Sequence, residues 1–144
     1  MKAFWNILYS VFFIGLITVA FLWLSERGQL IADIPVFHLV LLSLATFRLV
    51  RLFTYDHITD YLRDWVRTRR EDSFLGTAGS LLGCPWCTGM WFAFLAYVGY
   101  AAAPAVVLPL ALILSIAAAA SLFQLVANLI GWSAEATKRD VTQL

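Results

Sequence analysis

The residues best suited to chemistry are two cysteines with two residues between them, in the run Cys84-Pro85-Trp86-Cys87. Proline is favoured at the first position of a helix, which puts Cys84 at a helix N-terminus, where the positive end of the dipole favours a thiolate. Two thiols at this spacing can form a disulfide, so thiol–disulfide redox chemistry is one interpretation. Against it, the sequence has no second cysteine pair and no thioredoxin-like pattern, and a cytoplasmic location would keep both thiols reduced.

The same two cysteines would also make half of a tetrahedral zinc site. His57 or a neighbouring aspartate would have to complete it, or two subunits would each have to contribute a pair, and neither arrangement has the spacing of a known zinc motif. Haem attachment is excluded because Thr88 stands where that motif needs histidine. Two small buried thiols that shape a tight helix start are the simplest interpretation, and we predict neither a metal nor a cofactor.

A second group of polar residues lies within or next to apolar segments: Arg48, Arg51, Asp56, Gln124 and Asn128. Polar groups are costly inside a bilayer and usually face protein there, so we predict that these five form one cluster in the inner leaflet. In that cluster Arg48 would bond to Asn128 or Gln124, and Arg51 would pair with Asp56 or Asp60. Alternatively, Arg48 extends to the interface and Asn128 simply ties two helices together.

Two separated motifs carry a resemblance to a known family. The run Ala45-Thr-Phe-Arg-Leu-Val-Arg-Leu-Phe-Thr-Tyr-Asp56 is followed at a distance by Gly83-Cys-Pro-Trp-Cys-Thr-Gly-Met-Trp91. Together they resemble a family of small bacterial and phage membrane proteins of unknown function, in which R-L-x-R-L and a downstream aspartate precede C-P-x-C-x-G-x-W at the start of a transmembrane helix. The matching positions are Arg48, Arg51, Asp56, Cys84, Pro85, Cys87, Gly89 and Trp91, with Arg63 at a further basic position.

The resemblance covers roughly residues 40–130 and leaves out the first apolar segment. It implies that the two arginines, Asp56 and the cysteine pair form one cluster in the cytoplasmic leaflet. It implies no activity, because none is established for the family.

The composition identifies the kind of chain that must position these residues. Of 144 residues, 62% are hydrophobic and 13% are charged, the net charge is +1, and the mean hydropathy is +0.82. Soluble domains carry about 25% charged residues, and a domain of this size cannot bury so much apolar surface. The same values exclude a disordered chain, and the small net charge excludes a nucleic-acid-binding protein. We predict an all-α integral membrane protein with the lipid bilayer as its surroundings.

About 20 mostly apolar residues are needed to cross a bilayer as a helix. Four segments qualify within a single membrane domain, residues 1–144: about 3–24, 35–53, 85–103 and 106–130. The first is too long for a secretory signal and lacks a cleavage site, so we predict that it is retained. Apolar and charged residues alternate with helical spacing at 57–67, which predicts a short amphipathic helix in the headgroup plane. We predict a returning loop at 68–83 and a tail at 133–144.

The distribution of basic residues predicts the orientation of these spans. With four spans, nine of the ten basic residues fall on one side: Lys2, Arg48, Arg51, Arg63, Arg67, Arg69, Arg70, Lys138 and Arg139. Only Arg27 lies on the other side. Both termini are therefore predicted to be cytoplasmic, in the inner membrane of a bacterium.

Small side chains recur on the last two spans, where they would allow helices to approach closely. They are Gly89, Ala93, Ala96 and Gly99 on the third span and Ala111, Ser115 and Ala119 on the fourth. Both rows predict a packed hairpin of these spans, and they fit a contact between subunits equally well.

Three functions fit these features. We favour a non-enzymatic accessory, scaffolding or self-assembling membrane subunit, which would act on other membrane proteins or on copies of itself. One alternative is a membrane thiol–disulfide protein that uses Cys84 and Cys87. Another is a phage holin-like pore former, suggested by the short length, the several spans and the charged tail.

Overall fold

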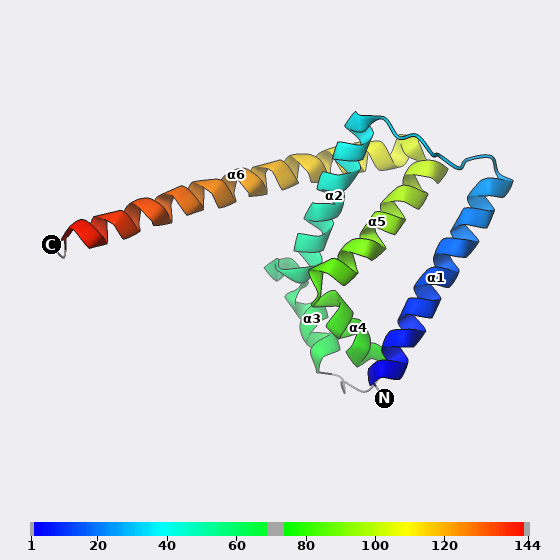
Figure 1. Ribbon diagram of the computed structural model, residues 1–144, viewed down its shortest axis with the longest axis horizontal. Helices are drawn as coiled ribbons and strands as arrows, with labels where there is room; N and C mark the ends of the chain where they lie inside the picture. The colour runs from blue at the N-terminus through cyan, green and yellow to red at the C-terminus, as the bar shows by residue number, and fades with distance from the viewer. Residues whose placement is uncertain (1, 69–73, 143–144) are drawn as a thin grey trace.

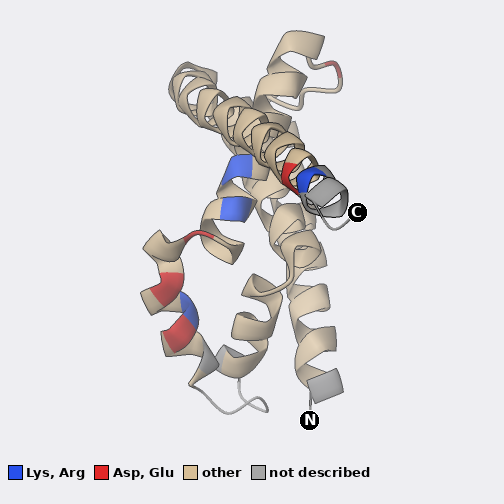
Figure 2. Ribbon diagram, turned by 90° about the vertical axis from the view of Figure 1, so that its left-hand side faces the viewer, with Lys and Arg blue, Asp and Glu red and all other residues tan. Residues whose placement is uncertain are grey.

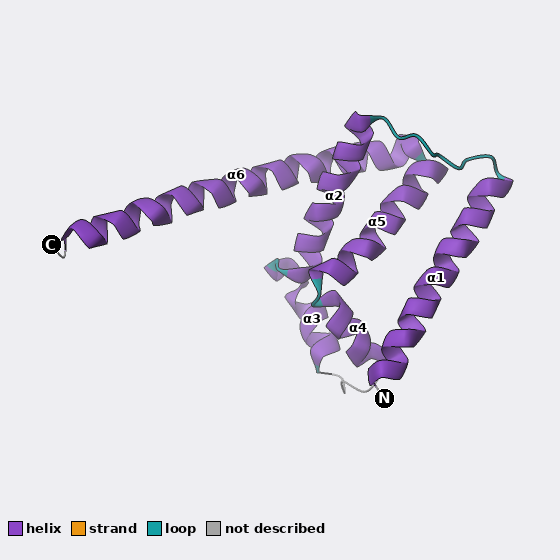
Figure 3. Cartoon of the chain, in the orientation of Figure 1, coloured by secondary structure: helices purple, strands orange, loops and turns teal. Residues whose placement is uncertain are grey.

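The computed structural model describes residues 2–68 and 74–142, and every regular element within them is a helix (Figure 3). The elements are α1 (Lys2–Glu26), α2 (Val36–Thr54), the 3-10 turn η1 (His57–Thr59), α3 (Asp60–Arg67), α4 (Phe74–Leu82), α5 (Pro85–Ala102) and α6 (Pro104–Thr142). The predicted all-α class is confirmed.

The helices form a small group from which one long helix projects (Figure 1). Helix α5 lies between α1 and α2, and α3 and α4 lie together at the end near the N-terminus. Helix α6 starts at the opposite end, packs across α2 and continues away from the group, so that the C-terminus lies far from the rest of the chain.

Among the described residues, three helices are long and apolar enough to cross a membrane: Phe4–Glu26, Val36–Thr54 and Pro104–Glu135. A fourth crossing is available if Gly76–Leu82 and Pro85–Ala102, which meet at an angle of 86°, are taken as one bent span. The turn after α5 lies where Pro104 predicts it, because Pro104 begins α6 directly after the capping residue Ala103.

The predicted loop at 68–83 is only partly correct, because α4 occupies 74–82 and residues 69–73 lie outside the described part. Gly79, one of three glycines that favour a loop in this segment, allows close helix packing instead. A Cβ atom on Gly79 would lie 2.6 Å from Cγ1 of Val66, a residue of α3 that is only 4% exposed. The helix predicted at 57–67 is present as η1 followed by α3.

The fourth predicted span extends further than expected. Instead of ending at 130 before a separate tail, α6 runs to Thr142. The segment after 130 contains no proline, and Gly131, the single glycine there, costs only about 1 kcal/mol relative to alanine in a helix.

The row of small residues on α6 packs mainly against α2, while Ala111 at its start also joins a buried cluster with Tyr100 of α5, the neighbour that the predicted hairpin required. Ala111 and Ser115 are each 4% exposed, and the Ser115 hydroxyl donates hydrogen bonds to the carbonyl of Leu41 at 2.7 Å and to that of Ala111 at 2.6 Å. Ala119, one turn further on, is half-buried. A serine and alanines let two helix backbones come close, which is why α6 crosses α2 at this row.

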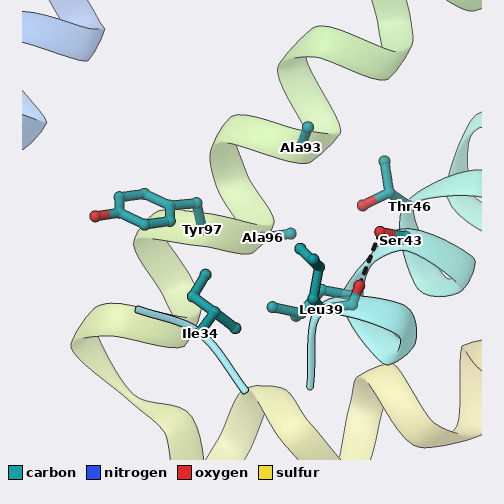
Figure 4. Close-up of a pocket in the computed structure, with 8 residues that line it drawn as sticks. Ile34, Leu39, Ser43, Thr46, Ala93, Ala96 and Tyr97 are labelled. Atoms are coloured by element: carbon teal, nitrogen blue, oxygen red, sulfur yellow. Dashed lines mark hydrogen bonds between the residues drawn. The ribbon is translucent and has the colours of Figure 1, made fainter. Parts of the chain in front are cut away.

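The row on α5 is divided between both neighbouring helices. A Cβ on Gly99 would lie 3.1 Å from Val107 of α6, whereas one on Gly89 would lie 3.7 Å from Val50 of α2. Between them, Ala93 and Ala96 leave an apolar cavity of about 350 Å³ facing α2 (Figure 4). In this cavity the Ser43 hydroxyl is bonded to the carbonyl of Leu39 at 2.8 Å.

Candidate functional site

Charged residues gather at the end of α2 and on the short helix that follows it (Figure 2). We call this group the charged cluster; it consists of Arg48, Arg51, Asp56, Asp60 and Arg63. Helices α4 and α5, which lie beside it, contain no charged residue between 74 and 102. The cluster is therefore a local polar region beside two uncharged helices.

One half-buried ion pair joins the last turns of α2 to the segment after it. Nη1 of Arg48 lies 3.0 Å from Oδ2 of Asp56, with the two side chains 23% and 27% exposed. The chain turns at Asp56, which brings the carboxylate back toward the helix that it has just left. The predicted pairing of Arg48 with Gln124 or Asn128 is wrong, because this nearby carboxylate is its partner.

Arg51 contacts aromatic rings, whereas Arg48, one turn earlier on α2, forms an ion pair. Its guanidinium lies 5.9 Å from the ring centres of Phe47 and of Tyr55, one turn on either side along the helix. Its Nε is buried and has no hydrogen-bond partner among the described residues. The predicted ion pair of Arg51 with Asp56 or Asp60 is not formed, and the arginine is stabilised by aromatic rings.

The start of α3 is joined to the end of α2 by hydrogen bonds from Thr59, which the sequence did not single out, and from Arg63. The hydroxyl of Thr59, a residue only 8% exposed, donates to the carbonyl of Leu52 at 2.6 Å. Nη1 of Arg63 donates to the carbonyl of Phe53 at 3.3 Å. A threonine one turn before a basic residue, after the apolar run of α2, is the sequence signal for such a cap.

Asp60 connects His57 and Arg63 on the exposed side of this turn. Its carboxylate accepts a hydrogen bond from Nδ1 of His57 at 2.7 Å and is ion-paired with Arg63. The hydrogen bond from His57, together with the adjacent Arg63 guanidinium, holds the pKa of Asp60 below its ordinary value of 3.8. The His57 side chain is 99% exposed, and its ring is engaged with Asp60 and not with the cysteines.

The two amides of the predicted cluster lie elsewhere. Gln124 and Asn128 are exposed, and Nε2 of Gln124 donates to Oδ1 of Asn128 at 3.3 Å. They are part of the distal half of α6, residues 122–135, where every residue is exposed. The structure thus brings Arg48 and Asp56 together and leaves both amides on the projecting helix (Figure 1).

Threonine hydroxyls hold the bend between α4 and α5, where the cysteine motif lies. The hydroxyl of Thr88, which is 4% exposed, donates to the carbonyl of Leu81 at 3.0 Å, and that of Thr54 lies 3.5 Å from the carbonyl of Leu82. The last carbonyls of a helix lack partners within it. Bonds from α5 and α2 to these carbonyls therefore end α4 and fix the direction in which Cys84 and Pro85 begin α5.

The cysteines line a cavity of about 430 Å³ between the first half of α1 and the α4–α5 bend, which we call the cysteine cavity. Asn6, Tyr9 and Ser10 of α1 form one wall, and Cys84, Cys87 and Met90 form the opposite wall. Both thiols are free and lie close to each other. The ring of Phe13 meets that of Trp91 edge-on at 4.6 Å and holds α1 against α5 beside the cavity.

His57 does not line the cysteine cavity, so the structure does not assemble the zinc site in which it would have joined the cysteines. Within residues 2–68 and 74–142 there is no group of three or more histidine, cysteine or acidic side chains placed to hold a metal ion.

These features define the class of protein: an all-helical chain with three or four candidate membrane spans, an ion-paired cluster at one end and a thiol pair at a helix bend. The sequence profile of the family described as "Protein of unknown function (DUF1360)" matches residues 41–127, which include the charged cluster and both cysteines. The chain belongs to this family, which confirms the resemblance found in its two motifs. Helix α1 and the end of α6 lie outside the match.

Two relatives from Bacillus subtilis (strain 168) are similar to the chain. The protein named UPF0713 protein YngL is 33% identical over 96 residues, which cover 59% of this chain and 74% of the relative. The protein named sporulation protein YjcA is 35% identical over 102 residues, which cover 60% of this chain and 86% of the relative. No solved structure matches the chain.

Proposed function

We propose that the chain is a non-enzymatic membrane subunit that acts by self-association through the distal half of α6. The observation that carries this proposal is the exposure of all residues from 122 to 135 on a helix that is apolar enough to span a membrane. The exposed side chains include Phe123, which is 76% exposed, and Leu129, which is 68% exposed. Lipid alone can cover such side chains, but it cannot satisfy the amides that lie among them.

Gln124 and Asn128 provide the specific contact. The two side chains together offer four N–H groups and two carbonyl oxygens, and the bond between them uses one donor and one acceptor. Amides on a membrane helix bond to groups on a neighbouring helix because hydrocarbon offers no partner. A second α6 carries the same donors and acceptors on the same face, so two copies satisfy one another.

The test compares self-association of the full-length chain in lipid nanodiscs or vesicles by energy transfer between donor- and acceptor-labelled copies. The variant Gln124→Leu/Asn128→Leu removes both amides and keeps the helix apolar. Each interhelical bond contributes roughly 1 kcal/mol, so we expect association to weaken about 10- to 30-fold. Ser133→Ala is the matched control, because the Ser133 hydroxyl is already bonded to the carbonyl of Ile130 within its own helix at 2.8 Å. Equal association of the amide variant and the wild type would refute the proposal.

We also propose that the end bearing the charged cluster faces the cytoplasm. The support is the concentration of basic residues at this end and the bias of cytoplasmic segments toward arginine and lysine. A membrane-impermeant maleimide tests the orientation. Cys84 and Cys87, near the same end, are expected to react only after cells are permeabilised, and reaction on intact cells would contradict the orientation.

Thiol–disulfide chemistry is a second candidate, favoured by the two free thiols that lie close together beside a cavity. A Cys84→Ser/Cys87→Ser variant distinguishes the two candidates. If the variant still self-associates, the assembly role is supported. If the wild type reacts with maleimide only after a reductant is added, its cysteines form a disulfide and redox chemistry is supported.

A further inference from the structure

The cysteine cavity brings together a set of sulfur atoms that neither the charged cluster nor the assembly proposal explains. Cys84, Cys87 and Met90 all line it, and they follow one another at intervals of three residues from the start of α5. Cys84 is the extended residue just before α5, and Cys87 and Met90 lie on its first two turns, so the three sulfur-bearing side chains form one stripe along the cavity. Met90 is the only methionine apart from the initial residue of the sequence.

The bend between α4 and α5 keeps this stripe open. The hydroxyl of Thr88 is turned toward α4, where it bonds to the Leu81 carbonyl, and therefore points away from the sulfurs. Trp86 of the same motif is 86% exposed and is absent from the lining of the cavity. Within the motif, Cys84, Cys87 and Met90 line this cavity with their sulfur-bearing side chains, and Trp91 adds an aromatic ring.

Sulfur donors select soft metal ions. Zinc requires four ligands, and the opposite wall adds only the amide and hydroxyl groups of Asn6, Tyr9 and Ser10. Cu(I) accepts thiolate and thioether ligands and is satisfied by fewer of them. We propose that the cysteine cavity binds one Cu(I) ion through the thiolates of Cys84 and Cys87 and the thioether of Met90.

Binding changes no oxidation state. Each cysteine loses its thiol proton to solvent as its sulfur bonds to the ion, and Met90 binds through a sulfur lone pair without losing a proton. Two thiolates and one Cu(I) carry a net charge of −1. The opposite wall is lined by the polar side chains of Asn6, Tyr9 and Ser10, so this charge would lie beside polar groups.

The test titrates the full-length chain in nanodiscs with Cu(I) under anaerobic conditions, in competition with a coloured Cu(I) chelator such as bicinchoninate. The wild type is expected to remove one equivalent of Cu(I) from the chelator, and the Cys84→Ser/Cys87→Ser variant none. Met90→Leu keeps the shape of the side chain but removes its sulfur, and we expect it to bind one equivalent at least ten-fold more weakly. Trp86→Leu changes the same motif outside the cavity and is expected to bind as the wild type does.

X-ray absorption of the wild-type Cu(I) complex gives a measurement that depends on no variant, and sulfur-only coordination is expected. Three results would overturn the proposal: no transfer of Cu(I) from the chelator, equal affinity of the wild type and Met90→Leu, or oxygen and nitrogen neighbours in the absorption spectrum. The proposal is independent of assembly through α6, because the residues that it uses lie on α1 and α5.

Discussion

Replacement of Gly79 by alanine tests the close packing of α3 on α4. In an exposed helix this change is favourable by about 0.5–1 kcal/mol, because alanine loses less conformational entropy than glycine. Here the new methyl group would lie 2.6 Å from Cγ1 and 3.3 Å from Cβ of Val66. Valine is stiff in a helix, and this valine is buried, so it cannot turn away without moving α3.

Forcing an extra methyl group into a packed contact typically costs about 1–3 kcal/mol, which exceeds the gain in helix propensity. We therefore expect Gly79→Ala to lower the free energy of unfolding by about 1–2 kcal/mol, measured by titration with SDS in mixed micelles. Gly15→Ala is the matched control, because no atom lies within 4 Å of its added Cβ. This control is expected to be neutral or slightly stabilising.

A double-mutant cycle separates the steric effect from other causes. Val66→Ala removes the methyl groups that the new Cβ would meet, so the two substitutions together are expected to cost less than the sum of their separate effects, by about 1 kcal/mol or more. Stabilisation by Gly79→Ala equal to that by Gly15→Ala, or strict additivity in the cycle, would refute this account of the α3–α4 contact.

Three further predictions concern the charged cluster and the helix bend. Asp56→Asn leaves the half-buried Arg48 without its carboxylate and should lower the free energy of unfolding by about 1–3 kcal/mol in the same SDS titration. Adding Arg48→Gln should restore part of this free energy, so the double variant should be more stable than Asp56→Asn alone. Thr88→Val removes the hydroxyl that caps the last carbonyls of α4 and should broaden the distribution of distances between spin labels on α4 and α5. Thr18→Val, which removes a hydroxyl bonded within α1, is the control and should leave that distribution unchanged. Because the pKa of Asp60 is held below 3.8, its stabilisation of α3 is present above that pH and is lost as the pH falls through the lowered pKa; amide exchange in α3 should accelerate there, and an Asp60→Asn variant should lose this pH dependence.

Several features follow from local sequence alone. Hydropathy identifies α1, α2, α5 and most of α6, because each is a continuous apolar run and the cost of exposing such a run to water does not depend on its neighbours. Pro85 and Pro104 mark the starts of α5 and α6, since proline lacks the N–H that a first helical residue leaves unpaired. The two motifs are sufficient to place the chain in its family.

Other features depend on contacts between distant residues. Glycines at 76, 79 and 83 are typical of a loop. Gly79 is nevertheless the point at which α4 approaches Val66, and packing against α3 is what favours a helix in this segment. Likewise, the sequence offers Arg48 both carboxylate and amide side chains as hydrogen-bond acceptors. The turn at Asp56 brings the carboxylate to Arg48, and an ion pair that forms over eight residues requires little chain ordering.

The direction of α6 is the largest difference. Hydropathy gives its apolar character but says nothing of its path, and a packed hairpin with α5 was expected. The path is set by the bond from Ser115 to Leu41, 74 residues apart in the chain, and by the small side chains that allow α2 and α6 to touch there. The long apolar helices can be located from the sequence because hydropathy is a local property, whereas α4 and the end of α6 could not be recognised as helical from it. Only the tertiary structure decided which helices meet, and so left Gln124 and Asn128 on the exposed half of α6, away from Arg48.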